Sequence, residues 1–255
     1  MGTSSGYSPP TGGDWNSLKR HLRTLSDDTT NDVEAKKVVS KFIKAIGGAE
    51  AFASGRRPTS SSGFDSQRSY SSAAARRVSS SILGFIGDAS KSGLQQALID
   101  RGLINLKGKS LDEIKETLIE FFSEPAVDGD AEAASRAVAK VFEDIFERAE
   151  SEAQLERIFS NIMSPDESEM FLCSFYEHYL YELFARTFFE DMMSKFGREK
   201  SIELSETVQD TIKAKIQRFQ CTKDLSKIDF NSPEGQTFVQ GILQNILEIL
   251  EDEHE

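Results

Sequence analysis

Residues 170–196, MFLCSFYEHYLYELFARTFFEDMMSKF, form the most apolar stretch of the chain. Their Phe, Leu and Met side chains recur every three or four residues, which is the period of an α-helix. These side chains fall on more than one side of that helix, as is typical of a helix with neighbours around it. Pro165 precedes the stretch and suits the first turn of a helix. The sequence therefore predicts a long central helix that forms the core of the fold.

Shorter amphipathic helices are predicted on both sides of this stretch. Apolar residues at helical spacing mark residues 14–25, 33–46, 73–85, 94–99, 111–122, 130–162 with a break near 150, 207–219 and 233–250. Asp14 or Ser17 is expected to cap the first of these helices, and Ser110 with Glu113 forms a capping box at the fifth. The pattern predicts an all-α fold: a bundle-like body of many helices, with a disordered N-terminal tail and a flexible Ser/Gly/Arg-rich loop at residues 49–72.

The totals limit the classes of protein to which the chain can belong. Its 255 residues allow one or two domains with a sizeable core. No apolar run is long enough for a membrane-spanning helix. Cys173 and Cys221 give neither a disulfide framework nor the spacing of a metal site, which suits thiols in a reducing compartment. We expect a cytoplasmic protein that needs no membrane, cofactor or metal.

Charge is distributed unevenly along the chain. The net charge is −12, but residues 1–110 hold 16 Lys and Arg against 9 Asp and Glu, a net charge of +7. Residues 111–255 hold 14 basic and 33 acidic residues, a net charge of −19. An acidic surface repels nucleic acid and attracts basic protein partners. Any contact with nucleic acid is therefore expected from the N-terminal part.

Composition and charge divide the chain into four regions. Residues 1–32 are predicted to form a flexible tail with a short docking helix, and residues 33–110 a basic, partly flexible helical region. Residues 111–250 are predicted to form an acidic helical body, followed by a solvated acidic tail at residues 251–255. Negative charge at the C-terminus of a helix is unfavourable, so fraying is expected there.

The docking helix carries one apolar stripe that includes Trp15, Leu18 and Leu22. A helix of this length is not stable alone in water, so another surface must cover the stripe. Two surfaces could cover the stripe. One is the protein's own body, and the other is a partner that receives the tail.

The segment ahead of this stripe, GTSSGYSPPTGG at residues 2–13, is small, polar and free of charged side chains. It has no apolar face, so packing cannot offset the entropy lost on ordering it. Removal of Met1 is expected because Gly2 is small, and it leaves an α-amine that is partly neutral and nucleophilic near neutral pH. Glycine has no side chain to hinder a partner's pocket. The other interpretation is an ordinary disordered terminus.

An opening of MGTSSGY, followed by a Gly/Pro/Ser tail and an acidic helical body, resembles the QatB family of the bacterial Qat anti-phage systems. The resemblance implies a defence role with three partners, namely an ATPase, a QueC-like enzyme and a TatD-like nuclease. It also implies that the QueC-like enzyme joins a deazaguanine carboxylate to the α-amine of Gly2 as an amide. The residues that this enzyme would read are Thr3, Ser4, Ser5, Gly6 and Tyr7.

A second hypothesis is that the Arg/Ser-rich segment binds nucleic acid. Arginines interleaved with aromatic residues can bind single strands by charge and stacking, and the candidates are Arg56, Arg57, Arg76 and Arg77. No recognised motif accompanies them, and a flexible loop explains the same composition. The chain would then be a nucleic-acid-associated helical subunit.

Motifs for catalysis are not found. Residues 102–110, GLINLKGKS, have five residues between the glycines where a phosphate-binding loop needs four. His178 lacks the Glu three residues earlier that helical di-iron sites use, because Phe175 is there. We therefore expect no catalytic residue, no cofactor site and no metal site, and a chain that is not an enzyme.

Overall fold

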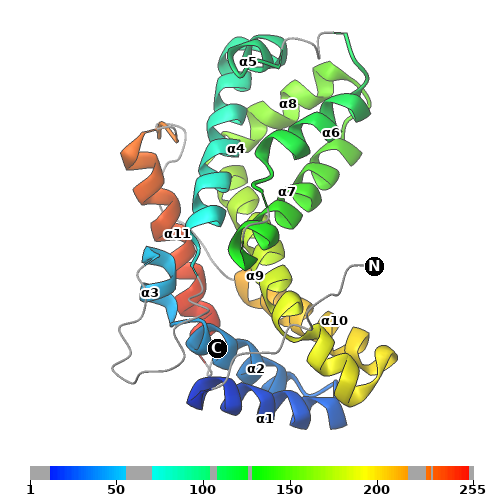
Figure 1. The fold of residues 1–255 in the computed structure, drawn as a ribbon. Helices are drawn as coiled ribbons and strands as arrows, with labels where there is room; N and C mark the ends of the chain where they lie inside the picture. The colour runs from blue at the N-terminus through cyan, green and yellow to red at the C-terminus, as the bar shows by residue number, and fades with distance from the viewer. Residues whose placement is uncertain are drawn as a thin grey trace. The chain divides into compact units, whose positions relative to one another are not determined.

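The computed structural model describes residues 12–55, 71–103, 108–125, 128–217, 228–230 and 232–252, except for the side chains of residues 165 and 166. This part of the chain contains eleven α-helices and no strand, so the prediction of an all-α fold is confirmed (Figure 1). The predicted disordered tail, except for Gly12 and Gly13, and residues 56–70 of the predicted flexible loop lie outside the described residues.

The described residues group into two compact units by their contacts. Unit 1 takes the described parts of Met1–Ser72, Leu180–Phe219 and Leu243–Glu255, and unit 2 those of Ala73–Tyr179 and Gln220–Ile242. The division falls within two helices, each of which contributes to both units. The four regions drawn from composition and charge stay a prediction.

Unit 1 is built from helices that are far apart in sequence. It contains α1 (Gly13–Asp27), α2 (Asp32–Ala45), α3 (Ala49–Ser54), α10 (Arg198–Ile216) and the C-terminal parts of α9 (Pro165–Phe196) and α11 (Pro233–Glu251). The helices α1 and α2 lie side by side, and both contact α10. In the core, the ring of Phe42 on α2 meets that of Phe184 on α9 edge to face, at 5.4 Å between centroids.

Unit 2 is dominated by helices that follow one another in sequence. It contains α4 (Ala73–Ser92), α5 (Leu94–Asp100), α6 (Leu111–Phe122), α7 (Gly129–Glu147), α8 (Glu152–Ile162) and the N-terminal parts of α9 and α11. The helix α4 contacts α5, α6, α7 and α8. Its Phe85 ring lies 5.6 Å from Phe122 and 5.9 Å from Phe159, between centroids, and Phe122 stacks on Phe142.

The predicted central helix is α9, which begins at Pro165 as expected. Within unit 1 its Phe184 and Phe188 rings contact α2 and α1. Within unit 2 its Tyr176 and Tyr179 hydroxyls bond to α4 and α7. All four side chains are fully buried, so the prediction of a helix with neighbours on several sides is confirmed.

Several predicted boundaries are also confirmed. Ser110 and Glu113 form the capping box of α6, because each side chain bonds to the other residue's backbone N–H. The expected break near residue 150 separates α7 from α8, and Ser151 caps α8 by accepting the backbone N–H of Gln154.

Four local predictions were wrong at helix boundaries. Residues 49–54 form α3 rather than loop, and Gly12, not Asp14 or Ser17, stands at the N-cap of α1. The helix α4 continues past residue 85 to Ser92. Gly87 is buried within it against Met163, and a Cβ at Gly87 would lie 3.3 Å from the Met163 methyl carbon, so the small residue suits this packing. The helix α10 begins at Arg198 instead of residue 207, because its buried face includes Ser201 and Ser205, which read as polar surface in the sequence.

The C-terminal end of α11 is held rather than frayed. Ser40 Oγ and Lys215 Nζ both donate to backbone carbonyls there: Ser40 to Glu251, and Lys215 to Asp252 and, at 3.0 Å, to Ile249. The Glu251 carboxylate accepts the backbone N–H of Ala49 at 3.0 Å. The expected fraying therefore does not hold for Glu251 and Asp252, because a buried lysine offsets the negative end of the helix.

Candidate functional site

The leader, which we define as residues 1–11, is followed directly by a helix fixed to unit 1. The exposed fractions of Trp15, Leu18 and Leu22 are 9%, 0% and 3%. The Trp15 ring lies 5.8 Å from the Phe188 ring, between centroids, and α1 packs along α2. The sequence allowed either the protein's own body or a partner to cover the apolar stripe, and in the structure the protein's own helices cover it. The leader thus starts from an anchored helix.

A polar contact also joins α1 to α2. His21 Nδ1 lies 2.9 Å from Glu34 Oε2, and Lys37 Nζ donates to Glu34 Oε1 at 2.7 Å. The hydrogen bonds from Lys37 and His21 hold the pKa of Glu34 below its ordinary value, because both stabilise the carboxylate. The contact between Glu34 and His21 therefore joins α1 to α2 in addition to the apolar packing of the stripe.

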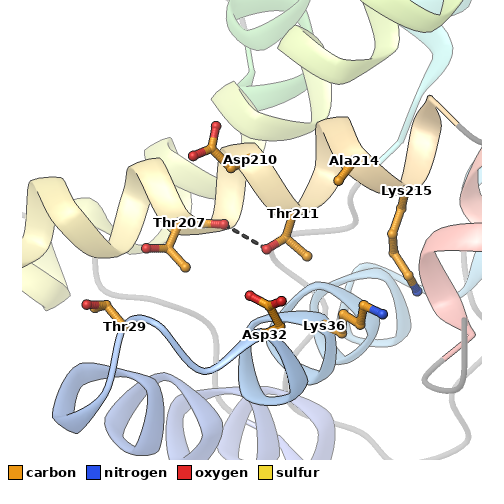
Figure 2. Close-up of a pocket in the computed structure, with 8 residues that line it drawn as sticks. All are labelled: Thr29, Asp32, Lys36, Thr207, Asp210, Thr211, Ala214 and Lys215. Carbon is orange, nitrogen blue, oxygen red and sulfur yellow. Dashed lines mark hydrogen bonds between the residues drawn. The ribbon is translucent and has the colours of Figure 1, made fainter.

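A surface pocket lies between α2 and α10 within unit 1, and its volume is about 390 Å³. Residues from the α1–α2 turn, the start of α2 and one side of α10 line it: Thr29, Asp32, Lys36, Thr207, Asp210, Thr211, Ala214 and Lys215. Figure 2 shows the Asp32 carboxylate pointing from α2 toward α10, with Thr207 and Thr211 on the facing helix. The polar groups of the lining are carboxylates, hydroxyls and ammonium groups.

Asp32 reaches this position because of local sequence. Asn31 caps α2 by accepting the backbone N–H of Glu34 at 3.1 Å, so Asp32 is the first helical residue. On α10, residues 207, 211 and 214 follow at spacings of four and three, which places them on one side of the helix.

A second polar cluster lies inside unit 2. The Asp130 carboxylate, 8% exposed, accepts the backbone N–H of Ala74 at 2.9 Å and the hydroxyl of Tyr179 at 2.9 Å. A longer bond of 3.4 Å comes from the backbone N–H of Ala75. Burial raises the pKa of Asp130 to about 6, although these three hydrogen bonds act in the opposite direction. Because Asp130 caps the start of α4 from the first turn of α7, we assign it a structural role.

The residues predicted from sequence fall into two groups. Gly2, Thr3, Ser4, Ser5, Gly6, Tyr7, Arg56 and Arg57 lie outside the described residues. Arg76 and Arg77 are on α4, where Arg76 Nη1 donates to Gln240 Oε1 at 2.9 Å. Arg77 donates to both carboxylate oxygens of Glu124, at 3.0 and 2.7 Å. Both of these arginines are therefore bonded within unit 2.

The remaining features concern metals and membranes. Within the described ranges, no group of three or more His, Cys, Asp or Glu side chains is placed to hold a metal ion. His178 Nε2 lies 3.7 Å from Asp144 Oδ2. None of the helices in the described part has the length and apolarity that crossing a bilayer requires.

Comparison with known proteins gives the family. A family model described as "Qat anti-phage system associated protein QatB" matches residues 65–250. The chain belongs to the QatB family. This QatB-family chain is thus a component of an anti-phage defence system. The matched range covers α4 to nearly the end of α11 and leaves out the leader and α1–α3. No curated protein and no solved structure matched the chain.

Sequence reasoning on this QatB-family chain missed the pocket. Asp32 and Lys36 on α2, like Thr207 and Thr211 on α10, belong to no motif in the sequence. Helical spacing shows which residues share a side of one helix, but it does not show which second helix faces that side. About 170 residues separate the two linings, so no local signal could have joined them.

Proposed function

We propose that this chain is a non-enzymatic member of the Qat system that presents its N-terminal glycine for modification. With Met1 removed, the Gly2 α-amine would enter a QueC-like partner. That enzyme would join a deazaguanine carboxylate to it as an amide, with loss of water from the two groups. The helical body would bind the ATPase subunit, and the complex would act in the cytoplasm with a TatD-like nuclease.

The anchoring of α1 is the observation that supports this proposal best. Trp15 and Leu18 are buried against the helices of unit 1, so the base of the leader is fixed. Gly12 is ten positions after Gly2, and a fully extended chain over that distance spans roughly 35 Å. A fixed base with a leader of this length suits delivery of an amine into another protein's active site.

The decisive experiment is co-expression with the other Qat proteins, followed by mass spectrometry of the N-terminal peptide. We expect an added mass on the Gly2 peptide of the wild-type chain. Gly2→Pro should remove both the added mass and phage resistance, because a proline amine is secondary and hindered. It should leave the thermal unfolding midpoint unchanged, since Gly2 precedes the anchored helix.

Gly13→Ala is the matched control. A Cβ at Gly13 would meet no atom within 4 Å, so this variant should keep the modification and the resistance. Full phage resistance in Gly2→Pro would contradict the proposal. So would a wild-type N-terminal peptide of unmodified mass from a strain that resists phage.

A further inference from the structure

The pocket between α2 and α10 offers hydrogen-bond acceptors at its threonines and carboxylates. Thr207 Oγ1 donates its proton to the Glu203 carbonyl at 2.8 Å. Thr211 Oγ1 donates to the Thr207 carbonyl at 2.7 Å, as Figure 2 shows. A hydroxyl has one proton and two lone pairs. Each of these two threonines therefore has lone pairs left to accept a bond from a ligand.

The charged groups of the lining strengthen this character. Asp32 and Asp210 contribute two carboxylates. Lys215 Nζ donates to the carbonyls of Ile249 and Asp252, so part of its donor capacity is already used at the end of α11. Figure 2 shows the Lys36 ammonium turned toward the end of the pocket where Lys215 lies. Around Asp32, Thr207 and Thr211, the pocket thus suits a cationic donor.

The leader supplies such a donor. Residues 1–11 contain no Lys, Arg, His, Asp or Glu, so the α-ammonium is the one charge that this segment carries. The leader can extend roughly 35 Å from Gly12. The helix α1 has 15 residues and is about 22 Å long, and Thr29 follows its end by two residues. The amine can therefore reach the pocket.

We infer that the pocket between α2 and α10 binds the α-ammonium group of the chain's own leader. Asp32 forms the ion pair, and the hydroxyl oxygens of Thr207 and Thr211 accept the remaining ammonium protons. This inference rests on the proposed function, because it describes how the amine to be modified is held before a partner takes it. The bound amine is protonated and unreactive, and release into the partner frees it.

The test measures the reactivity of the α-amine in the full-length chain. Purified protein is treated near neutral pH with a limiting amount of an acetylating reagent, and mass spectrometry follows the acetylated N-terminal peptide. Asp32→Asn should raise the acetylation rate about threefold, a size that suits the loss of a solvent-exposed ion pair. In the wild type, high salt should raise the rate to a similar extent, because salt screens such pairs.

Asp112→Asn is the matched control. Asp112 lies in the first turn of α6, as Asp32 lies in the first turn of α2, but it belongs to unit 2 and does not line the pocket. It should leave the rate unchanged, and circular dichroism should show both variants folded. An Asp32→Asn rate equal to that of the wild type would overturn the inference.

Two further outcomes separate the alternatives. Protection that disappears on dilution would place the amine of a second copy in the pocket, which overturns binding within one chain. If Gly2 is modified in cells but the acetylation rate does not respond to Asp32→Asn, the inference fails and the proposed function stands. If the rate responds but Gly2 is never modified, the proposed function fails and the pocket still binds the amine.

Discussion

Units 1 and 2 both cap a helix start with a carboxylate from another helix, but in different surroundings. In unit 1 the partly exposed Glu251 accepts the backbone N–H of Ala49 at the start of α3. In unit 2 the buried Asp130 accepts the backbone N–H of Ala74 and Ala75 at the start of α4, and the Tyr179 hydroxyl as well. The two caps are therefore expected to differ in their contribution to stability.

The units also differ in charge. The two segments with net charges of +7 and −19 do not correspond to the two units. Unit 1 combines residues 1–72, with a net charge of +3, with the neutral residues 180–219 and the acidic residues 243–255. Its ranges hold 17 basic and 19 acidic residues, a net charge of −2. The ranges of unit 2 hold 13 basic and 23 acidic residues, a net charge of −10. Unit 2 is therefore the better surface for a basic partner.

The largest predicted effect is a loss of stability that falls on unit 2 more than on unit 1. A Cβ at Gly235 would lie 2.3 Å from the Asp229 carbonyl oxygen and 2.5 Å from Phe230 Cα, so Gly235→Ala must displace backbone. That backbone is fixed, because Ser80 Oγ donates to the Phe230 carbonyl at 2.6 Å and Phe230 is buried. We expect a loss of about 3 kcal/mol in the free energy of unfolding. Hydrogen exchange should show weaker protection in unit 2 than in unit 1.

Gly241→Ala, six residues further along α11, is the control. Nothing lies within 4 Å of its Cβ position, so the substitution should stabilise the helix by about 0.5–1 kcal/mol. A Gly235→Ala variant as stable as wild type in denaturant unfolding would show that residues 229–230 are not fixed in unit 2.

The next effect compares the two carboxylate caps directly. Asp130→Ala leaves two backbone N–H groups and the Tyr179 hydroxyl without their acceptor inside unit 2, so we expect a loss of about 2 kcal/mol. Glu251→Ala removes a partly exposed cap from α3 and should cost about 1 kcal/mol. Denaturant unfolding of both variants at neutral pH measures the difference. Equal losses would mean that burial does not distinguish the two caps.

The smallest of the three effects is the pH dependence that Asp130 contributes. Burial raises its pKa to about 6 from 3.8, so the folded state binds this proton more tightly than the unfolded chain. The contribution to stability is therefore present at low pH and is lost as the pH rises toward and past about 6. Between about pH 4.5 and 6, the wild type should lose about 1.5 kcal/mol relative to Asp130→Asn.

This measurement needs unfolding curves of the two proteins at several pH values. The difference between wild type and Asp130→Asn should change little above about pH 7, where the carboxyl is ionised in both states. A difference that stays constant across the whole range would mean that the Asp130 carboxyl has an ordinary pKa.

Much of the fold could be predicted because its signals are local. The apolar period of residues 170–196 located α9, and the Ser110–Glu113 capping box located the start of α6. The missed helix α3 depends on a distant residue. Gly48 offers no side-chain cap, yet α3 begins after it because Glu251 accepts the backbone N–H of Ala49.

In the candidate site too, some properties follow from local sequence and others depend on tertiary structure. The leader's lack of charged side chains, its glycine at position 2 and the apolar stripe of α1 are properties of adjacent residues, and the sequence by itself determined them. Only the tertiary structure decided that Phe188 covers Trp15 and that Asp32 faces α10. The reason is physical: helical period depends on neighbours along the chain, whereas the surface that a helix meets depends on the packing of the whole unit.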